Sequence, residues 1–154
     1  GDTMFANLYL AYETLSDPMK AMLDGRKAVN SSRKGDAAAG RQKSVDENPK
    51  DASDVQTEST HPALRTHPET GRQALYVNRG HTVCFEGATP EESAPILEYL
   101  FEHQIRPEFT CRFRWAPGSI AIWDNRCALH YPLNDYHGQR RVMHRVTMEG
   151  DTPQ

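Results

Sequence analysis

Residues 31 to 60 contain no Leu, Ile, Met or aromatic residue and are rich in Ser, Lys, Asp, Gln and Ala. Such a segment buries too little apolar surface to offset the entropy lost when a chain becomes ordered. The core must therefore come from the residues on either side of it. A loop of this length in a compact domain is usually either functional or disordered. We expect residues 31–60 to form a mobile lid over an active site or a disordered loop.

The chain has 154 residues, enough for one domain with one core, which we predict over residues 1–150. The net charge of −3 argues against a general nucleic-acid surface, and no apolar run is long enough to span a bilayer. Without a secretory segment at the start, a cytoplasmic protein with no membrane partner is expected. A homo-oligomer is left open. The chain begins at Gly1 rather than Met, as a processed product or a fragment of a longer chain does.

The three cysteines, Cys84, Cys111 and Cys127, are an odd number without paired spacing. A disulfide framework or a zinc cluster prefers an even set or a C-x-x-C pair. We predict buried free thiols in a reducing compartment.

Helix and strand signals occur on both sides of the polar segment. Apolar spacing predicts a helix over residues 6–15, and Ser16 with Gly25 frames a second helix. Thr89 and Glu92 form a capping box before a third helix. Strands are predicted by alternation or turn signals over residues 63–66, 73–78, 109–115, 119–123 and 140–148. Together these elements predict an α+β domain built on an antiparallel β-sandwich or barrel.

The last predicted strand carries two arginines on one face, Arg141 and Arg145, separated by roughly 13 Å. Each could anchor a different anion through its planar guanidinium. On strand spacing alone, exposed or salt-bridged arginines are the more economical interpretation. His130 lies just past a predicted strand, in a polar segment, and is the histidine that differs most from surface or core histidines.

A single histidine cannot hold a catalytic metal, so partners are needed. Fe(II) oxygenases use two histidines and one carboxylate, two of which commonly form an H-x-D or H-x-E pair. One match exists, His67-Pro68-Glu69. We exclude this pair as metal ligands, because the proline between them and the following Thr70-Gly71 predict a hairpin tip.

These residues resemble the taurine dioxygenase/2,4-D dioxygenase (TauD/TfdA) family of Fe(II)- and 2-oxoglutarate-dependent oxygenases. The resemblance covers nearly the whole chain, and its most specific block is residues 123–145. The matching segments are Gly1-Asp2-Thr3, His61-Pro62 to Asn78, Arg106-Pro107-Glu108-Phe109, Trp123-Asp124-Asn125-Arg126, His130-Tyr131, Asn134-Asp135-Tyr136 and Arg140 to Arg145.

The resemblance implies a fold and a set of roles. The family fold is a double-stranded β-helix, or jelly roll, here with flanking helices and with its N-terminal part missing. His130 corresponds to the distal iron ligand. Arg141 corresponds to the anchor of the far carboxylate of 2-oxoglutarate, with Thr3 as its hydroxyl partner. Arg145 corresponds to the residue that contacts the anionic head of the substrate.

The chain also departs from the family pattern. The family's H-x-D pair lies upstream of the Gly-Asp-Thr motif, at which this chain starts, so two iron ligands are not expected in it. Asn30 stands where relatives often have His. His81 stands where taurine-specific members have a Phe in the substrate pocket. A sulfonate, an alkylsulfate or a carboxylate substrate is therefore as plausible as taurine.

The resemblance implies a dioxygenase that uses Fe(II), O₂ and 2-oxoglutarate to hydroxylate a small anionic organic substrate, with cleavage of a C–S or C–O bond. The chain by itself is expected to be inactive. A second interpretation is a non-catalytic fragment or pseudo-enzyme that binds small anions or a partner subunit. Stoichiometric iron in the isolated chain would show that this assignment of its ligands is wrong.

Overall fold

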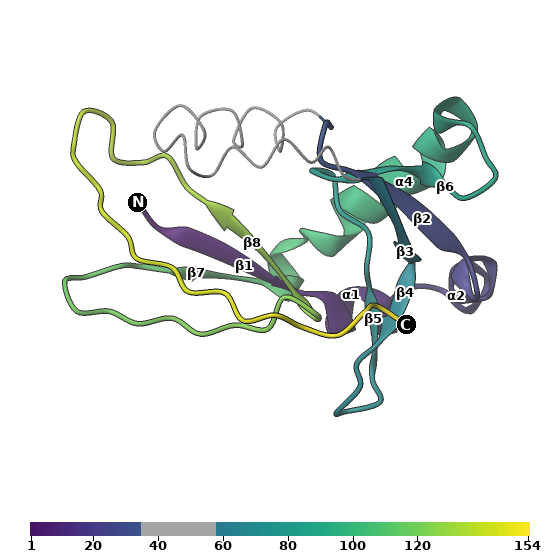
Figure 1. Ribbon diagram of the computed structural model, residues 1–154, viewed down its shortest axis with the longest axis horizontal. Helices are drawn as coiled ribbons and strands as arrows, with labels where there is room; N and C mark the ends of the chain where they lie inside the picture. The colour runs from purple at the N-terminus through teal and green to yellow at the C-terminus, as the bar shows by residue number, and fades with distance from the viewer. Residues whose placement is uncertain (35–57) are drawn as a thin grey trace.

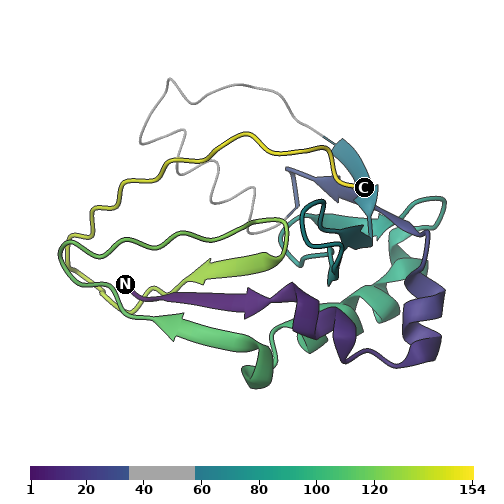
Figure 2. The ribbon, with the colours of Figure 1, turned by 90° about the horizontal axis from the view of Figure 1, so that it is seen from below.

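The computed structural model describes residues 1–34 and 58–154, which form an α+β arrangement with three small antiparallel sheets (Figure 1). The first sheet has the order β7-β1-β8, from β1 (Thr3–Asn7), β7 (Thr110–Phe113) and β8 (Ala128–Pro132). Its central strand, β1, pairs with one neighbour on each edge, so strands more than a hundred residues apart in sequence lie side by side (Figure 2).

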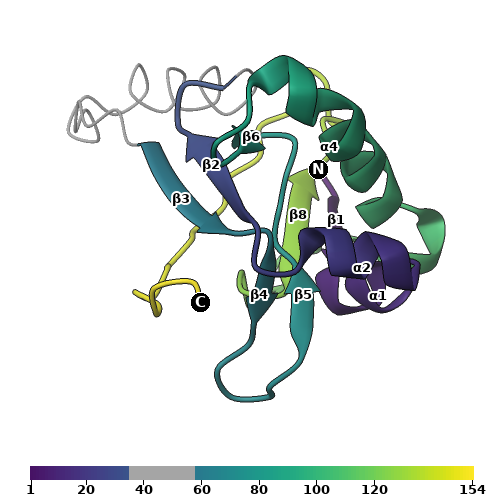
Figure 3. The same ribbon diagram turned by 90° about the vertical axis from the view of Figure 1, so that its right-hand side faces the viewer.

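The second sheet has the order β3-β2-β6, from β2 (Lys27–Ser31), β3 (Glu58–Pro62) and β6 (Thr82–Phe85). The third is the hairpin of β4 (Leu64–Thr66) and β5 (Gln73–Leu75), with β5 beside the first helix, α1 (Leu8–Glu13) (Figure 3). The predicted turn closes this hairpin. The N–H of Gly71 donates to the carbonyl of His67 at 2.9 Å, and Gly71 has φ +69°, a conformation that favours glycine.

The helices begin where the sequence provides caps. Asn7 accepts hydrogen bonds from the N–H groups of Tyr9 and Leu10 and so starts α1 (Leu8–Glu13). Ser16 caps α2 (Asp17–Leu23), as predicted. The capping box predicted at Thr89 and Glu92 is present at the start of α4 (Pro90–Gln104), which is followed by the short 3-10 helix η2 (Pro107–Phe109).

The main core lies between the helices and two of the sheets, β3-β2-β6 and β4-β5. It is made of buried residues from α1, α2, α4 and the strands around them, among them Leu15, Leu23, Leu75, Phe85, Leu97, Leu100 and Phe101. A second, smaller cluster joins Leu8, Tyr9 and Ala74 to Cys127 and Leu129 at the base of β8. The sheet that carries β8 is therefore attached to the rest of the molecule through few apolar residues.

Several sequence predictions were wrong. Residues 6–15 are not one helix, because β1 extends through Asn7 and the helix starts only at Leu8. Pairing on both edges of β1 overrides the local helical spacing. Residues 31–60 are not entirely loop, since Ser31 ends β2 and residues 58–60 belong to β3. The rest of the predicted lid, residues 35–57, lies outside the described residues.

The two strands predicted over residues 119–123 and 140–148 do not form. A strand needs a neighbour that satisfies its backbone hydrogen bonds, and no strand in the described part of the chain pairs with either segment. Their apolar side chains are exposed: Ile122 by 92% and Val146 by 93%. The segment after β8 instead runs back along the molecule to end beside β4 (Figure 1), where the N–H of Thr66 donates to the carbonyl of Gln154.

The three cysteines are free, as predicted, but they are not buried: Cys111 is exposed, and Cys84 and Cys127 are half-buried. Among the described helices, none has the length and apolar character needed to cross a membrane.

The placement of the core predicts a sharp difference between two aliphatic truncations. Leu97→Ala, at a site only 2% exposed, should lower the free energy of unfolding by about 2–5 kcal/mol through lost burial and a residual cavity. Ile122→Ala, at a site 92% exposed, should change it by less than about 0.5 kcal/mol. Urea denaturation measures both, and equal losses would contradict this placement of the core.

Candidate active site

His130 lies within β8, directly opposite Phe5 of β1. Residues paired in this way in an antiparallel sheet project to the same face, which is also the face of Thr3, two residues before Phe5. The indole of Trp123 contacts both rings, with centroids 5.0 Å from His130 and 5.1 Å from Phe5. His130 is exposed as a residue, although the indole of Trp123 lies beside its ring.

Partial burial and the positive charge of Arg145 lower the pKa of His130 from its ordinary value of 6.5. Both causes disfavour the protonated ring. A histidine coordinates a metal through a neutral imidazole nitrogen, so a depressed pKa keeps the ligand form available at neutral pH. Arg145 is thus one of the two causes of the lowered pKa of His130, although residues 140–148 do not form the predicted strand.

Thr3 is buried, with 5% of its surface exposed, and its hydroxyl oxygen accepts a hydrogen bond from the indole N–H of Trp115 at 2.9 Å. Since an indole N–H can only donate, the hydroxyl proton of Thr3 remains available for an acceptor. Trp115 is not among the site residues predicted from the sequence. The alternation of residues 109–115 was the available signal, because it put Trp115 on the apolar face of the predicted strand.

Arg141 lies beside the start of β1. Its Nε donates to the carbonyl of Gly1 at 3.1 Å, and its guanidinium lies 5.7 Å from the centre of the Tyr136 ring. Gly1 is two residues before Thr3 in the chain, so this bond places a cation near the buried hydroxyl. Arg145 is exposed.

His81 lies in the turn before β6, which belongs to a different sheet from β8. It is exposed, and its carbonyl accepts a hydrogen bond from the N–H of Ser31. The structure therefore brings Thr3, Arg141, Arg145 and His130 to one region, and does not bring His81 into contact with them. The roles assigned to these five residues stay predictions.

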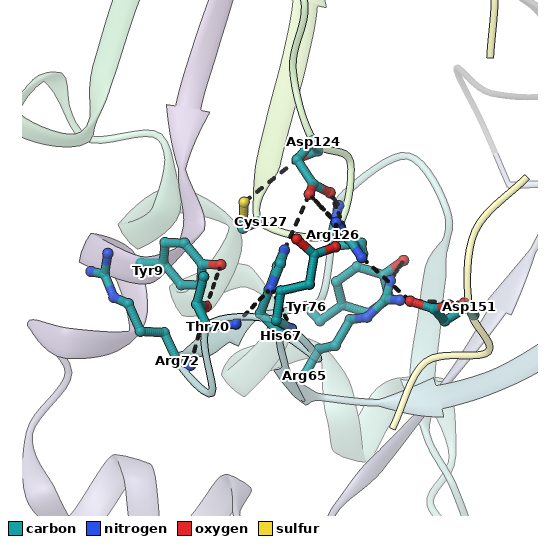
Figure 4. A network of polar contacts seen from close by, with 11 residues as sticks. Tyr9, Arg65, His67, Thr70, Arg72, Tyr76, Asp124, Arg126, Cys127 and Asp151 are labelled. Atoms are coloured by element: carbon teal, nitrogen blue, oxygen red, sulfur yellow. Dashed lines mark hydrogen bonds and ion pairs between the residues drawn. The ribbon is translucent and has the colours of Figure 1, made fainter. Parts of the chain in front are cut away.

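The loop before β8 is held by an ion-pair cluster around Asp124 (Figure 4). Arg126 donates from Nε to both carboxylate oxygens of Asp124, at 3.0 and 2.9 Å, and from Nη2 at 2.7 Å. The backbone N–H of Arg126 adds a further bond at 2.8 Å. Hydrogen bonds from the Arg126 side chain are the main reason that the pKa of Asp124 lies well below its usual range. Burial opposes this shift, while the backbone N–H of Arg126 and the ring of His67 add to it.

The same cluster reaches two other parts of the chain. Arg126 Nη2 contacts Glu69 at 2.9 Å, in the turn between β4 and β5, and Nη1 contacts Asp151 at 3.3 Å, in the C-terminal segment. His67 Nε2 lies 3.1 Å from Asp124 Oδ2. His67 and Glu69, which we excluded as a metal pair from the sequence, contact Asp124 and Arg126 in the structure; the exclusion itself stays a prediction.

His67, Asp124 and Cys127 are the one group of three metal-ligand side chains found among the described residues, with candidate atoms within 4.8 Å of one another. The contacts that these side chains already make argue against a bound metal. The carboxylate of Asp124 is already bound by a guanidinium, a backbone N–H and an imidazole. The thiol of Cys127 lies 3.8 Å from the Asp124 carbonyl. A cation would have to displace Arg126.

Comparison with known proteins identifies the family. A model of the taurine catabolism dioxygenase TauD, TfdA family matches residues 1–147, and the chain belongs to this family. It is 36% identical to an alpha-ketoglutarate-dependent sulfate ester dioxygenase of Pseudomonas putida, over 99% of this chain and 52% of that protein. It is 34% identical to a putative alpha-ketoglutarate-dependent sulfonate dioxygenase of Schizosaccharomyces pombe, over 99% of this chain and 38% of that protein.

A similar solved structure is that of a taurine dioxygenase from Burkholderia xenovorans, with a TM-score of 0.66 and 39% identity. The match covers 84% of this chain and 39% of that one. The chain thus spans about half or less of the length of the relatives it matches.

The electrostatics of His130 predict a specific response to one substitution. Arg145→Gln should raise the pKa of His130 toward 6.5, because one of the two causes that lower it is removed. Arg106→Gln, which removes an exposed cation that is not among those causes, should leave it unchanged. A proton NMR titration of the His130 ring measures both. An unchanged pKa in Arg145→Gln would contradict the proximity of the two groups.

The same shift predicts how stability depends on pH. Because the folded state binds the His130 proton less readily than the unfolded state, the full contribution to stability is present above about pH 6.5. It should be lost as the pH falls from 6.5 through the lower pKa of the folded state. His130→Gln should flatten this part of the curve, as thermal unfolding between pH 7.5 and pH 5 (about the range in which histidines titrate) would show.

Proposed function

We propose that this chain supplies part of the active site of an Fe(II)- and 2-oxoglutarate-dependent dioxygenase that acts on a small anionic organic compound. One observation carries the proposal: a histidine of depressed pKa shares a sheet face with a buried hydroxyl, and two arginines lie close by. A neutral imidazole suits a metal, and the cations suit two carboxylate or sulfonate groups. Family membership supports the same reaction class.

The proposed architecture is the family's double-stranded β-helix, or jelly roll, of which this chain forms a part. Three antiparallel sheets, with β1 central between β7 and β8, are compatible with such a core. The likeness to the taurine dioxygenase structure at a TM-score of 0.66 supports this proposal.

The described residues supply one of the three protein ligands expected for an iron site. His130 offers an imidazole on an exposed residue, and its neutral form is favoured. Within residues 1–34 and 58–154, no group of three ligand-type side chains includes His130. We therefore assign the remaining ligands to the family's H-x-D pair, which lies upstream of the Gly-Asp-Thr motif. When bound, Fe(II) with 2-oxoglutarate and O₂ supplies the oxidation of a substrate C–H bond.

The protein's own contribution is the binding and orientation of two anions. The free hydroxyl proton of Thr3 and the guanidinium of Arg141 hold the far carboxylate of 2-oxoglutarate, while Trp115 fixes the Thr3 hydroxyl. Arg145 holds the anionic head of the substrate beside His130. A place for His81 in the substrate pocket rests on the family resemblance alone, since the described residues show no contact between it and this group.

The position of the substrate anion determines which bond breaks. If Arg145 holds a sulfonate or an ester oxygen near the metal, the carbon next to that group is the one oxidised. Hydroxylation at this carbon leads to cleavage of the adjacent C–S or C–O bond. Sulfonates, alkylsulfates and carboxylates are all candidate substrates, and the two relatives described above are named for sulfate esters and for sulfonates.

A second candidate, a non-catalytic anion-binding fragment or pseudo-enzyme, is favoured by a single observation: the described residues place one metal ligand, not three, beside the arginines. Titration with 2-oxoglutarate, in the presence and absence of Fe(II), of a polypeptide in which residues 1–154 follow a family segment bearing the H-x-D pair separates the two. Binding that is equally tight without metal favours the second candidate.

Arg141→Gln should raise the concentration of 2-oxoglutarate needed for half-maximal turnover by roughly 10- to 100-fold, since a hydrogen bond to a charged group contributes about 1.5–3 kcal/mol. The measurement uses succinate formation by a polypeptide in which residues 1–154 follow a family segment bearing the H-x-D pair. Arg106→Gln, an exposed arginine outside the site, is the matched control. An unchanged requirement in Arg141→Gln would overturn the assignment.

The substrate class is tested with the same polypeptide. We expect 2-oxoglutarate turnover to be stimulated by at least one of a panel of sulfonates, alkylsulfates and aryloxy-carboxylates, and stimulation to be lost in Arg145→Gln. A neutral alcohol of matched size serves as the control compound. Equal stimulation by that alcohol would argue against recognition of an anion.

A further inference from the structure

Asp124 connects the β4–β5 hairpin to the ring of His130. Its neighbour in sequence, Trp123, contacts the His130 ring, with centroids 5.0 Å apart at an interplanar angle of 51°. Trp123 in turn contacts Phe5, opposite His130 on β1. The carboxylate of Asp124 is bound by His67. A continuous line of contacts therefore leads from His67 through residues 124 and 123 to His130.

His67 has one defined tautomer. The backbone N–H groups of Glu69 and Thr70 both point to its Nδ1, each at 3.3 Å. Because backbone N–H groups can only donate, Nδ1 must be an acceptor, and the ring proton is on Nε2. That N–H donates to Oδ2 of Asp124 at 3.1 Å. The ring thus joins the hairpin turn to the loop before β8 (Figure 4).

The connection is held firmly at its hairpin end. His67 is only 5% exposed and packs edge-on against Tyr9, with ring centroids 6.1 Å apart. The hydroxyl of Tyr9 in turn contacts Thr70 Oγ1 at 3.2 Å. At the other end, the N–H of Leu8 donates to the carbonyl of Cys127 at 2.9 Å, which fixes the start of β8. A buried imidazole between two anchored segments leaves the Asp124 carboxylate little freedom to rotate.

We infer that His67 is a positioning residue: through Asp124 it sets the orientation of Trp123 and thereby of the His130 ring. This inference rests on the proposed function in one respect only, that His130 is a metal ligand. Groups outside the ligands of a metal commonly orient them, and their loss lowers metal affinity about 10- to 100-fold. Here the orientation is transmitted by ring contact, because the indole of Trp123 packs at a tilt against the His130 ring.

Two substitutions of His67 test the hydrogen bonds of its two ring nitrogens separately. The amide nitrogen of Gln can reach the place of Nε2 and donate to Asp124, but Gln loses the acceptor at Nδ1. The side-chain oxygen of Asn takes the place of Nδ1 and accepts from the turn, but Asn cannot reach Asp124. His67→Gln and His67→Asn are therefore matched variants that keep opposite bonds.

The first readout needs no metal and no activity. Ring ¹H and ¹⁵N shifts of His130, and the indole signal of Trp123, are recorded by NMR at pH 8, where His130 is neutral. We expect them to stay near their wild-type positions in His67→Gln and to move in His67→Asn. The reverse order would overturn the inference, because it would mean that only the turn contacts matter. Unmoved signals in both variants would overturn it too.

Controls exclude a general loss of structure. His103 is also a buried histidine, 2% exposed, and contacts the carbonyl of Ala11 at 2.8 Å, remote from Asp124 in the network described. His103→Gln should destabilise the chain without moving the His130 ring signals. If it moves them as much as His67→Asn, the shifts report destabilisation and the inference fails.

The second readout tests the metal. In the polypeptide that carries the H-x-D segment, His67→Asn should weaken Co(II) affinity by roughly 10-fold, with His67→Gln close to wild type. If NMR shows the reorientation while His130→Ala leaves Co(II) affinity unchanged, the proposed function fails and the positioning role stands. A Co(II) charge-transfer band abolished by Cys127→Ser would instead show a metal at His67, Asp124 and Cys127, and would overturn the inference.

Discussion

The pairing of β1 on both edges is the constraint on which the site depends. Backbone hydrogen bonds to β7 and β8 fix Phe5 opposite both Cys111 and His130, and Thr3 opposite both Phe113 and Pro132. Because side chains alternate along a strand, this register alone puts Thr3 and His130 on one face. A shift of one residue would send His130 to the opposite face from Thr3. The relation between hydroxyl and imidazole is therefore a property of the backbone ladder.

The electrostatics of the region follow from which charges have partners. Asp124 is neutralised by Arg126, so this carboxylate adds little negative field. The cation that acts on His130 is Arg145, and its effect is to favour the neutral ring. The proposed roles of these two residues, a metal ligand that need not lose a proton and a cation that binds an anion, are mutually compatible. The positive charge near His130 disfavours a further cation that binds alone. A metal that binds together with an anion suits this region better.

Local signals in the sequence were predicted well, and non-local ones were not. The Ser16 cap, the Thr89 and Glu92 capping box and the turn at Gly71 depend on residues within a few positions of one another. The strands β1, β2, β6 and β8 form only because distant segments pair, and none of the four was predicted. Conversely, residues 119–123 follow a turn signal and are mostly apolar, as a strand can be, but have no partner strand in the described part of the chain. The role of His130 came from family resemblance, while the contact between His67 and Asp124 had no sequence signal.

The weak apolar attachment of the β7-β1-β8 sheet explains why a polar network lies at the base of β8. Leu8, Tyr9 and Ala74 are the buried residues that Cys127 and Leu129 pack against there. Apolar contact is not directional and does not by itself fix the orientation of the loop that precedes β8. Hydrogen bonds have preferred angles, so the bonds from His67 and Arg126 to the half-buried carboxylate of Asp124 restrict that loop. The small apolar cluster keeps the sheet attached and the ladder with β1 sets the face of His130, while the polar network holds the loop that carries Trp123 beside the His130 ring.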